Sequence, residues 1–300
     1  MIKIANAPCS WGVLEFEAKT QSPGYEQVLD EIAQTGYVGT ELGDWGFMPS
    51  DPGRLRDELT GRRLAMVGAF VTTRLVDSRS YAETRERAVV TGRLLAAVAQ
   101  DTPPVIVLSD EPTADPHRAR EAGRVTPALG FPDEWWDTAA EGVEDIARAV
   151  LDEAGLRTVF HHHCATFVET PAEIDALMKR LDPALVGLCL DTGHAIYGGG
   201  SSADLLHRFR ERIWHIHFKD CEPRVAARAR DQAWDYLTAL RFGLFCELGK
   251  GSVDFAGLLR DLETTGYDGW IVVEQDVLPA MGAPLDSARR NRHYLKGIGI

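Results

Sequence analysis

Short apolar runs that end in a polar residue alternate along the chain with longer amphipathic segments. An apolar run of about four to eight residues is typical of a buried strand, and apolar residues spaced three and four apart are typical of a helix packed on a sheet. The predicted strands are 2–7, 36–41, 64–71, 105–108, 156–163, 187–191, 212–220 and 269–274. The predicted helices are 25–35, 52–63, 81–100, 138–154, 170–181, 202–211, 254–265 and 287–296.

Strand and helix alternate eight times in this pattern. Strands that are buried on both faces indicate a parallel sheet covered by helices. The pattern therefore predicts a (β/α)₈ TIM barrel, built as a single domain over residues 1–300. The count of elements leaves an open, doubly wound sheet as the alternative.

The predicted strand 187–191 ends abruptly in a carboxylate. Because side chains alternate along a strand, Leu188 and Leu190 share one face, and Gly187, Cys189 and Asp191 share the other. A lone aspartate at a strand end is usually a cap or a turn former. It becomes a candidate for chemistry only if other strands end in the same way.

Other predicted strands do end in the same way, with titratable side chains on the face opposite the apolar residues. In the strand 212–220, Trp214, Ile216 and Phe218 should face the covering helices. His162 should also face the helices, as a hydrogen-bonded structural residue. Six of the nine histidines lie at three strand ends, and in a barrel the carboxyl ends of strands carry catalytic residues. The inward residues of this predicted site are Glu41, His161, His163, Asp191, His215, His217, Lys219 and Glu274.

The net charge of −13 argues against a nucleic-acid partner, since proteins of that class carry a basic stripe. The basic stretches 224–230 and 289–296 are interpreted as solvated faces. Five cysteines without a CxxC pair fit a reducing compartment, and no apolar run reaches the roughly 20 residues of a membrane helix. These features predict a cytoplasmic protein with a small-molecule substrate and no membrane partner.

Two long segments between predicted elements, 109–137 and 222–251, interrupt the regular alternation. Long segments in compact domains are usually functional, so a lid or a contact in a homo-oligomer is a hypothesis for each. The first contains Trp135 and Trp136, and the second contains Gly249-Lys250-Gly251, which is too short a glycine signal to indicate phosphate binding.

Imidazoles combined with Asp191 and Glu274 could bind a divalent cation such as Mn²⁺, Co²⁺, Mg²⁺ or Zn²⁺. The lack of thiolate pairs disfavours a closed structural zinc site. A cation with open positions would act as a Lewis acid on a substrate carbonyl and stabilise an enolate. Lys219 and His163 could move the proton, because burial near a cation is expected to lower the pKa of a lysine.

The remaining candidates are assigned to substrate binding on their positions near strand ends. They are Asn6, Trp11, Glu41, His194 and His215. The alternative for each is a hydrogen-bonded residue of the barrel without a role in chemistry.

Several of these stretches carry a resemblance to a known family. They are Asn6-Ala7-Pro8-Cys9-Ser10-Trp11-Gly12, Gly39-Thr40-Glu41-Leu42-Gly43, His161-His162-His163, Leu190-Asp191-Thr192-Gly193-His194, His215-Ile216-His217-Phe218-Lys219-Asp220 and Gly249-Lys250-Gly251-Ser252-Val253-Asp254-Phe255. Over nearly its whole length the chain resembles the inosose dehydratase family of inositol catabolism. More broadly it is similar to the xylose-isomerase-like sugar isomerase/epimerase superfamily.

The resemblance implies a metal, Mn²⁺ or Co²⁺ foremost, held by Asp191, His217, Glu274 and a residue of the fifth strand, with Glu274 also an acid/base group. Ketose epimerases have a glutamate at that fifth-strand position, where this chain has His161. His163 remains the alternative ligand. One carboxylate fewer favours elimination over two-sided epimerisation, so the implied reaction is dehydration of scyllo-inosose (2-keto-myo-inositol) through an enolate.

Three other functions remain as alternatives. A metal-dependent sugar isomerase or 3-epimerase would use the same cation on a ketose or keto-sugar. A DNA-repair endonuclease of the related metal-dependent barrels would need a basic groove, which the charge balance disfavours. A catalytically silent binding barrel would not need so many converging titratable groups.

Overall fold

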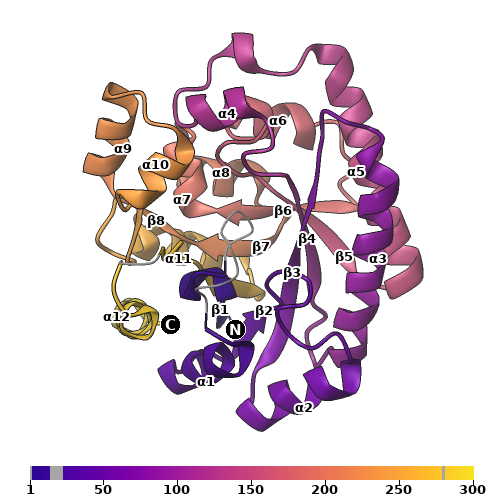
Figure 1. Ribbon diagram of the computed structural model, residues 1–300, viewed down its shortest axis with the longest axis vertical. Coiled ribbons are helices and arrows are strands. Elements are labelled where there is room, and N and C mark those ends of the chain that lie inside the picture. The colour runs from indigo at the N-terminus through magenta and orange to yellow at the C-terminus, as the bar shows by residue number, and fades with distance from the viewer. Residues whose placement is uncertain (1, 14–22, 279–280) are drawn as a thin grey trace.

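Eight parallel strands close into a barrel in the computed structural model, which describes residues 2–13, 23–278 and 281–300 (Figure 1). Around the barrel the strands follow the order β1-β10-β7-β6-β5-β4-β3-β2, and β1 pairs with both β2 and β10. This closure confirms the TIM barrel and excludes the open sheet. The barrel strands are β1 (Lys3–Asn6), β2 (Gly39–Glu41), β3 (Ala65–Thr73), β4 (Val105–Asp110), β5 (Arg157–His161), β6 (Val186–Asp191), β7 (Ile213–Phe218) and β10 (Trp270–Val273).

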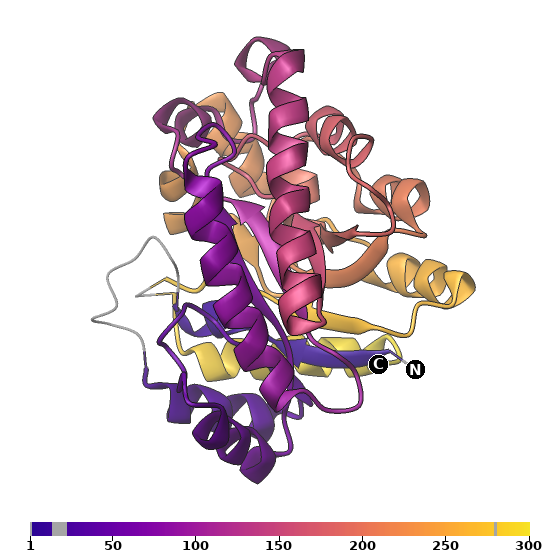
Figure 2. The same ribbon diagram turned by 90° about the vertical axis from the view of Figure 1, so that its right-hand side faces the viewer.

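Helices cover the outside of the barrel, and α3 and α5 stand side by side along it (Figure 2). Helix α1 forms as predicted because Val28, Leu29 and Ile32 present one apolar stripe to the sheet, and Gly36 ends it with φ of 88°. The main covering helices are α1 (Tyr25–Thr35), α2 (Pro52–Arg62), α3 (Ser80–Val98), α5 (Asp133–Ala154), α6 (Pro171–Met178), α8 (Ser202–Phe209), α11 (Phe255–Thr265) and α12 (Pro284–Gly297). Within the described ranges, none of the helices combines the length and apolar character that crossing a bilayer requires.

The segment 109–137 is more ordered than the sequence indicated. It contains α4 (Pro116–Glu121) and the short 3₁₀ helix η2 (Pro127–Leu129), and α5 begins at Asp133. Arg118 of α4 is buried and contacts Glu173 of α6 at 2.7 Å. Glu173 also completes the predicted capping box with Thr170. A fixed ion pair therefore ties this segment to the barrel.

The segment 222–251 folds into two helices and part of a hairpin. They are α9 (Pro223–Asp231), α10 (Tyr236–Arg241) and an antiparallel pair of β8 (Asp220–Cys221) with β9 (Phe245–Cys246). The Asp220 carboxylate accepts hydrogen bonds from the N–H groups of Gly249, Gly251 and Val253. The Gly-Lys-Gly stretch is thus a turn held by Asp220.

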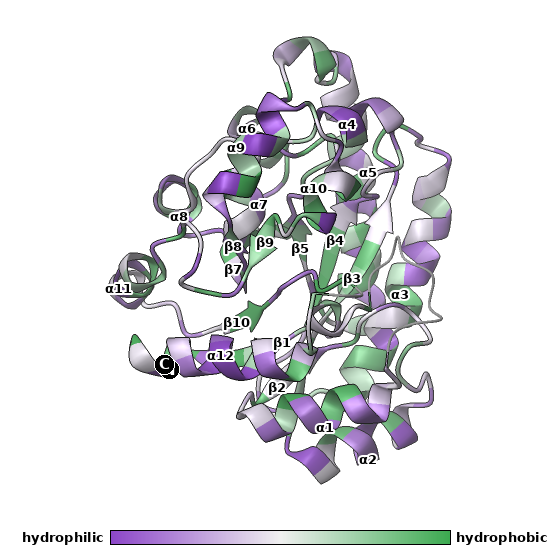
Figure 3. Cartoon of the chain, turned by 60° about the vertical axis from the view of Figure 1, so that its left-hand side comes forward, coloured by the Kyte–Doolittle hydropathy of each residue, from purple (hydrophilic) through white to green (hydrophobic). Residues whose placement is uncertain are grey.

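The barrel interior is apolar below the strand ends, while the outer helices are hydrophilic on their exposed sides (Figure 3). Cys189 lies in this interior, and Leu188 and Leu190 pack outward, as predicted. The prediction that Trp214 faces the helices is wrong. Strand pairing steps from Leu188–Ile213 to Cys189–His215, so Trp214 is an extra residue whose ring fills the space above Gly187.

Candidate active site

A cavity of about 70 Å³ opens at the carboxyl ends of the barrel strands. This is the end of a TIM barrel at which substrates bind. Ala7, Pro8, Val13 and Phe70 are among its apolar lining residues. The polar residues that line it are Glu41, Asp44, His161, His163, Lys219, Glu274 and Asp276.

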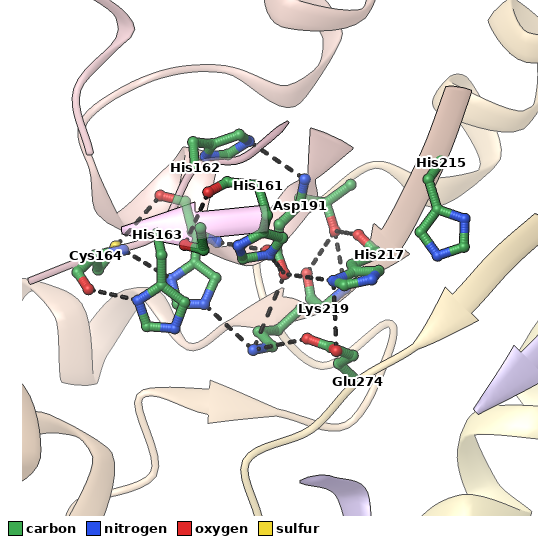
Figure 4. A network of polar contacts seen from close by, with 12 residues as sticks. His161, His162, His163, Cys164, Asp191, His215, His217, Lys219 and Glu274 are labelled. Atoms are coloured by element: carbon green, nitrogen blue, oxygen red, sulfur yellow. Dashed lines mark hydrogen bonds and ion pairs between the residues drawn. The ribbon is translucent and has the colours of Figure 1, made fainter. Parts of the chain in front are cut away.

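Four predicted ligands meet at the base of this cavity (Figure 4). One donor atom from each of His161, Asp191, His217 and Glu274 lies within 4.8 Å of all the others. His161 Nε2 is 3.5 Å from Asp191 Oδ2, and His217 Nδ1 is 3.4 Å from Glu274 Oε1. The four side chains come from β5, β6, β7 and the end of β10, which are adjacent in the barrel. We call this set the tetrad.

The donor atoms of the tetrad fit a cation. Nε2 of His161, Oδ2 of Asp191 and Nδ1 of His217 are buried without a hydrogen-bond partner in the described part of the chain. Buried polar atoms normally have partners, so unpaired atoms that converge on one point indicate a missing ligand. Burial, then the charge of His217, lowers the pKa of His161 well below its usual value, which keeps its imidazole neutral, the form that binds metals. Burial opposes a charge on His217, but Cys189, Glu274 and Glu41 raise the pKa of His217 well above its usual value, so a bound cation would have to displace a proton from its ring.

His217 is oriented by Glu41, which reaches it from the other side of the barrel. Glu41 Oε1 lies 3.1 Å from His217 Nε2 and 2.8 Å from His215 Nε2. Burial alone would raise the pKa of Glu41, but the two histidines lower it to about 2. Since Nε2 of His217 is engaged by the carboxylate, its Nδ1 is left to face the tetrad.

Lys219 lies beside the tetrad and is surrounded by acidic groups. Its Nζ is 3.1 Å from Glu274 Oε2, 3.2 Å from Asp276 Oδ1 and 3.3 Å from His194 Nε2. Burial opposes its charge, but Asp276, Glu274 and Asp191 together hold the pKa of Lys219 well above its usual value. The expected lowering of this pKa is therefore not found.

Asp276 is a site residue that the sequence reasoning missed. It is buried, lines the cavity and contacts Lys219. It follows Glu274 by two positions, so continuing the alternation one step beyond the predicted strand would have found it.

His163 lines the cavity but is not part of the tetrad. Its Nδ1 lies 2.6 Å from the carbonyl oxygen of Cys164. A carbonyl can only accept, so Nδ1 carries the hydrogen, and the neutral ring keeps a lone pair on Nε2. His162 accepts a hydrogen bond from the N–H of Asp191 at 3.2 Å, which is a structural role.

Two predicted substrate-binding residues do not reach the cavity. Asn6 shares the outward face of β1 with Ile4, because Ala5 takes the inward position. Trp11, in the 3₁₀ helix η1 (Pro8–Trp11), is buried and donates from Nε1 to Glu31 at 2.6 Å. The expectation that these two residues line the pocket is wrong.

His194 and His215 lie deeper than predicted, and neither lines the cavity. His194 is on the short helix α7 (Thr192–Tyr197), behind Lys219, and its ring centre is 3.8 Å from that of His163. His215 lies beneath Glu41. Both are therefore positioned to support other side chains of the site.

Comparisons with known proteins agree with this architecture. The family model described as xylose isomerase-like TIM barrel matches residues 77–297. A curated inosose dehydratase from Clostridium botulinum (strain Alaska E43 / Type E3) is 30% identical over 299 residues, covering 98% of this chain and 96% of that protein. Another from Lacticaseibacillus casei is 32% identical over 302 residues, covering 98% and 96%.

Solved structures show the same fold at low identity. The probable 3-DHS dehydratase AsbF from Bacillus anthracis has a TM-score of 0.69 at 16% identity and covers 99% of both chains. The 3-keto-D-glucoside 4-epimerase YcjR from E. coli has a TM-score of 0.68 at 14% identity and covers 99% of this chain and 100% of its own. The matching family model and the curated relatives show that the chain belongs to the xylose isomerase-like TIM barrel family and, within it, to the inosose dehydratases.

Proposed function

We propose that this chain is a metal-dependent hydro-lyase that dehydrates a cyclic keto-sugar, with scyllo-inosose as the first substrate to test. The observation that carries the proposal is the tetrad, in which donor atoms of His161, Asp191 and His217 lack hydrogen-bond partners and converge with Glu274 beside Lys219 at the base of a cavity. The names of the curated relatives support the reaction class.

The tetrad residues would hold the cation, and a mixed set of nitrogen and carboxylate donors suits Mn²⁺ or Co²⁺. A divalent cation bound there would act as a Lewis acid toward the ketone of the substrate. Cys189 could join His161 and His217 in another ligand set, but burial raises the pKa of its thiol to about 11. We therefore favour the carboxylate-containing set.

Dehydration breaks a C–H bond beside the ketone and a C–O bond one carbon further, and it forms a carbon–carbon double bond. The substrate loses one proton and one hydroxyl in total, so one water molecule is released, and the enol product rearranges to a dione. The proton taken from carbon stays on the base, and the proton that completes the water comes from the acid. The base must then lose its proton and the acid regain one before the next turnover. His163 can accept the proton, because its Nε2 keeps a lone pair and the residue lines the cavity. Lys219, on the same cavity, can donate a proton to the departing hydroxyl.

The test is an assay on scyllo-inosose with added Mn²⁺ or Co²⁺ and after chelation, in which dione absorbance and exchange of substrate protons in D₂O are both followed. We expect cation-dependent formation of the dione. Lys219→Met should abolish dione formation while the protein still binds Co²⁺. Proton exchange without loss of water would replace the proposal with an isomerase or epimerase, and turnover unaffected by chelation would contradict the role of the metal.

A further inference from the structure

A second cavity adjoins the catalytic one at the same end of the barrel. We call it the side groove. The two cavities share Gly43, Asp44, Phe70 and Pro112 as lining residues, so they meet along a common rim. The side groove has a volume of about 720 Å³, whereas the catalytic cavity has about 70 Å³. A volume in the range of about 300–1,000 Å³ is typical of sites for small organic ligands.

The side groove exposes two large apolar side chains. Trp45 is 47% exposed and Val90 is 48% exposed, and both line it. The end of β3, the loop after β4 and the outer face of α3 complete its walls, and Thr72, Thr91 and Thr113 are among the lining residues. A mixture of apolar and uncharged polar lining residues suits a neutral ring.

A tight turn holds Trp45 at the surface. The N–H of Phe47 donates to the carbonyl of Asp44 at 2.9 Å, and Gly46 has a φ of 86°. A positive φ at the third residue of such a turn is the pattern of a type II turn, which glycine adopts without strain. Trp45 is therefore the second residue of a fixed turn, and its ring is presented to the groove rather than buried.

The charges along the side groove disfavour an anionic ligand. Among the described residues that line it, Asp44, Glu86 and Glu111 are acidic and Arg87 is basic, and Glu111 is paired with Arg74. Arg87 already donates to the carbonyl of Thr72 at 2.6 Å. A phosphate or carboxylate would meet net negative charge there, so a neutral ligand is favoured.

We infer that the side groove is a subsite for a neutral ring, a second sugar or an aryl group, carried as a substituent by the keto-sugar. The substrate class then extends from bare inosose to cyclic keto-sugars that carry such a ring substituent. This inference depends on the proposed function at one point, which is that the reacting ring of the substrate lies over Lys219. The substituent crosses the rim at Phe70 and packs against Trp45.

The first test is calorimetric binding of phenyl β-D-glucopyranoside and methyl β-D-glucopyranoside, which requires no turnover. The unmodified protein should bind the phenyl compound more tightly. Trp45→Ala should reduce that preference about three- to tenfold, the scale of one aromatic contact, and Trp45→Phe should retain most of it. Trp135→Ala is the matched control, because Trp135 is 46% exposed and lines neither cavity.

The outcomes separate this inference from the proposed function. A phenyl preference that depends on Trp45 supports the subsite even if the protein dehydrates no keto-sugar. Dehydration of scyllo-inosose without any phenyl preference keeps the function and overturns the subsite. Light scattering tests whether a second copy of the chain occupies the groove instead. If Trp45→Ala changes the mass in solution but not the preference for the phenyl compound, the groove is a contact between copies of the chain and the inference is wrong.

Discussion

The two halves of the barrel's carboxyl end deliver different side chains. Four adjacent strands, β5, β6, β7 and β10, form what we call the ligand half, because each brings one member of the tetrad. The other four, β1 to β4, form the wall half. At their carboxyl ends, the inward-facing residues are Ala7, Glu41, Phe70 and Ser109. The side groove opens between α3 and the ends of β2, β3 and β4.

This difference separates chemistry from shape. Strands that are neighbours in a barrel lie about 5 Å apart, so four consecutive strands can place their terminal side chains around one cation. The wall half carries few titratable groups over the cavity and supplies the surfaces that a substrate would contact. Changes in the ligand half should therefore affect metal binding and turnover, and changes in the wall half should affect selectivity or stability.

The largest expected effect comes from the two fifth-strand histidines, which lie two residues apart. His161→Gln removes a ligand and should weaken Co²⁺ binding by more than about 100-fold. That figure is the upper end of the loss seen when a residue that only orients a ligand is replaced. His163→Gln should leave Co²⁺ binding nearly unchanged and lower turnover. Calorimetry and the absorbance of bound Co²⁺ measure the first effect without relying on activity.

The pair is also a matched control, since both substitutions replace a buried histidine by the same residue. Thermal unfolding of the metal-free variants checks that both proteins remain folded. Loss of Co²⁺ binding in His163→Gln alone would contradict the tetrad and make His163 the fifth-strand ligand.

Sequence periodicity predicted the barrel and the inward direction of the four tetrad side chains, because both depend on local alternation, whereas the choice of these four as ligands came from the family resemblance. The apolar partners of Asp191 point outward along its strand, so the carboxylate must point inward, and no distant contact changes that. The same reasoning failed for Trp214, because a bulge in the β6–β7 pairing shifts the faces by one residue. It also failed for Asn6, which lies at the end of β1 as predicted but on the outward face of that strand.

Other features of the site could not be predicted, because they depend on residues far apart in sequence. Glu41 contacts His215 and His217 across more than 170 positions, so its positioning role became visible only in three dimensions. The side groove is formed by the loops after β2 and β4, the end of β3 and helix α3, and no motif in any one of them signals a cavity. Helix α4 was missed because Arg118, its buried anchor, is a charged residue.

An intermediate effect is expected at Glu41, which belongs to the wall half but acts on the ligand half. Glu41→Gln should weaken Co²⁺ binding about 10- to 100-fold, because the amide holds His217 Nε2 less firmly than the carboxylate does. Glu111→Gln is the control, since that carboxylate pairs with Arg74 at the surface. A raised KM with unchanged Co²⁺ affinity would instead make Glu41 a substrate ligand.

The smallest effect is expected deep in the wall half, at Tyr81 of α3. Its hydroxyl donates to the carbonyl of Leu75 at 2.8 Å, and burial raises its pKa to about 12, so it remains a neutral donor across the physiological range. Tyr81→Phe leaves that buried carbonyl unpaired and should lower the free energy of unfolding by about 1–2 kcal/mol, measured by urea denaturation.

Turnover and Co²⁺ affinity should not change in Tyr81→Phe, because Tyr81 lines neither cavity. Tyr294→Phe is the control, since the Tyr294 hydroxyl makes no hydrogen bond within the described ranges, and this variant should unfold as the unmodified protein does. A loss of Co²⁺ affinity in Tyr81→Phe would mean that the wall half transmits strain to the tetrad, and the division of the barrel end into chemistry and shape would then fail.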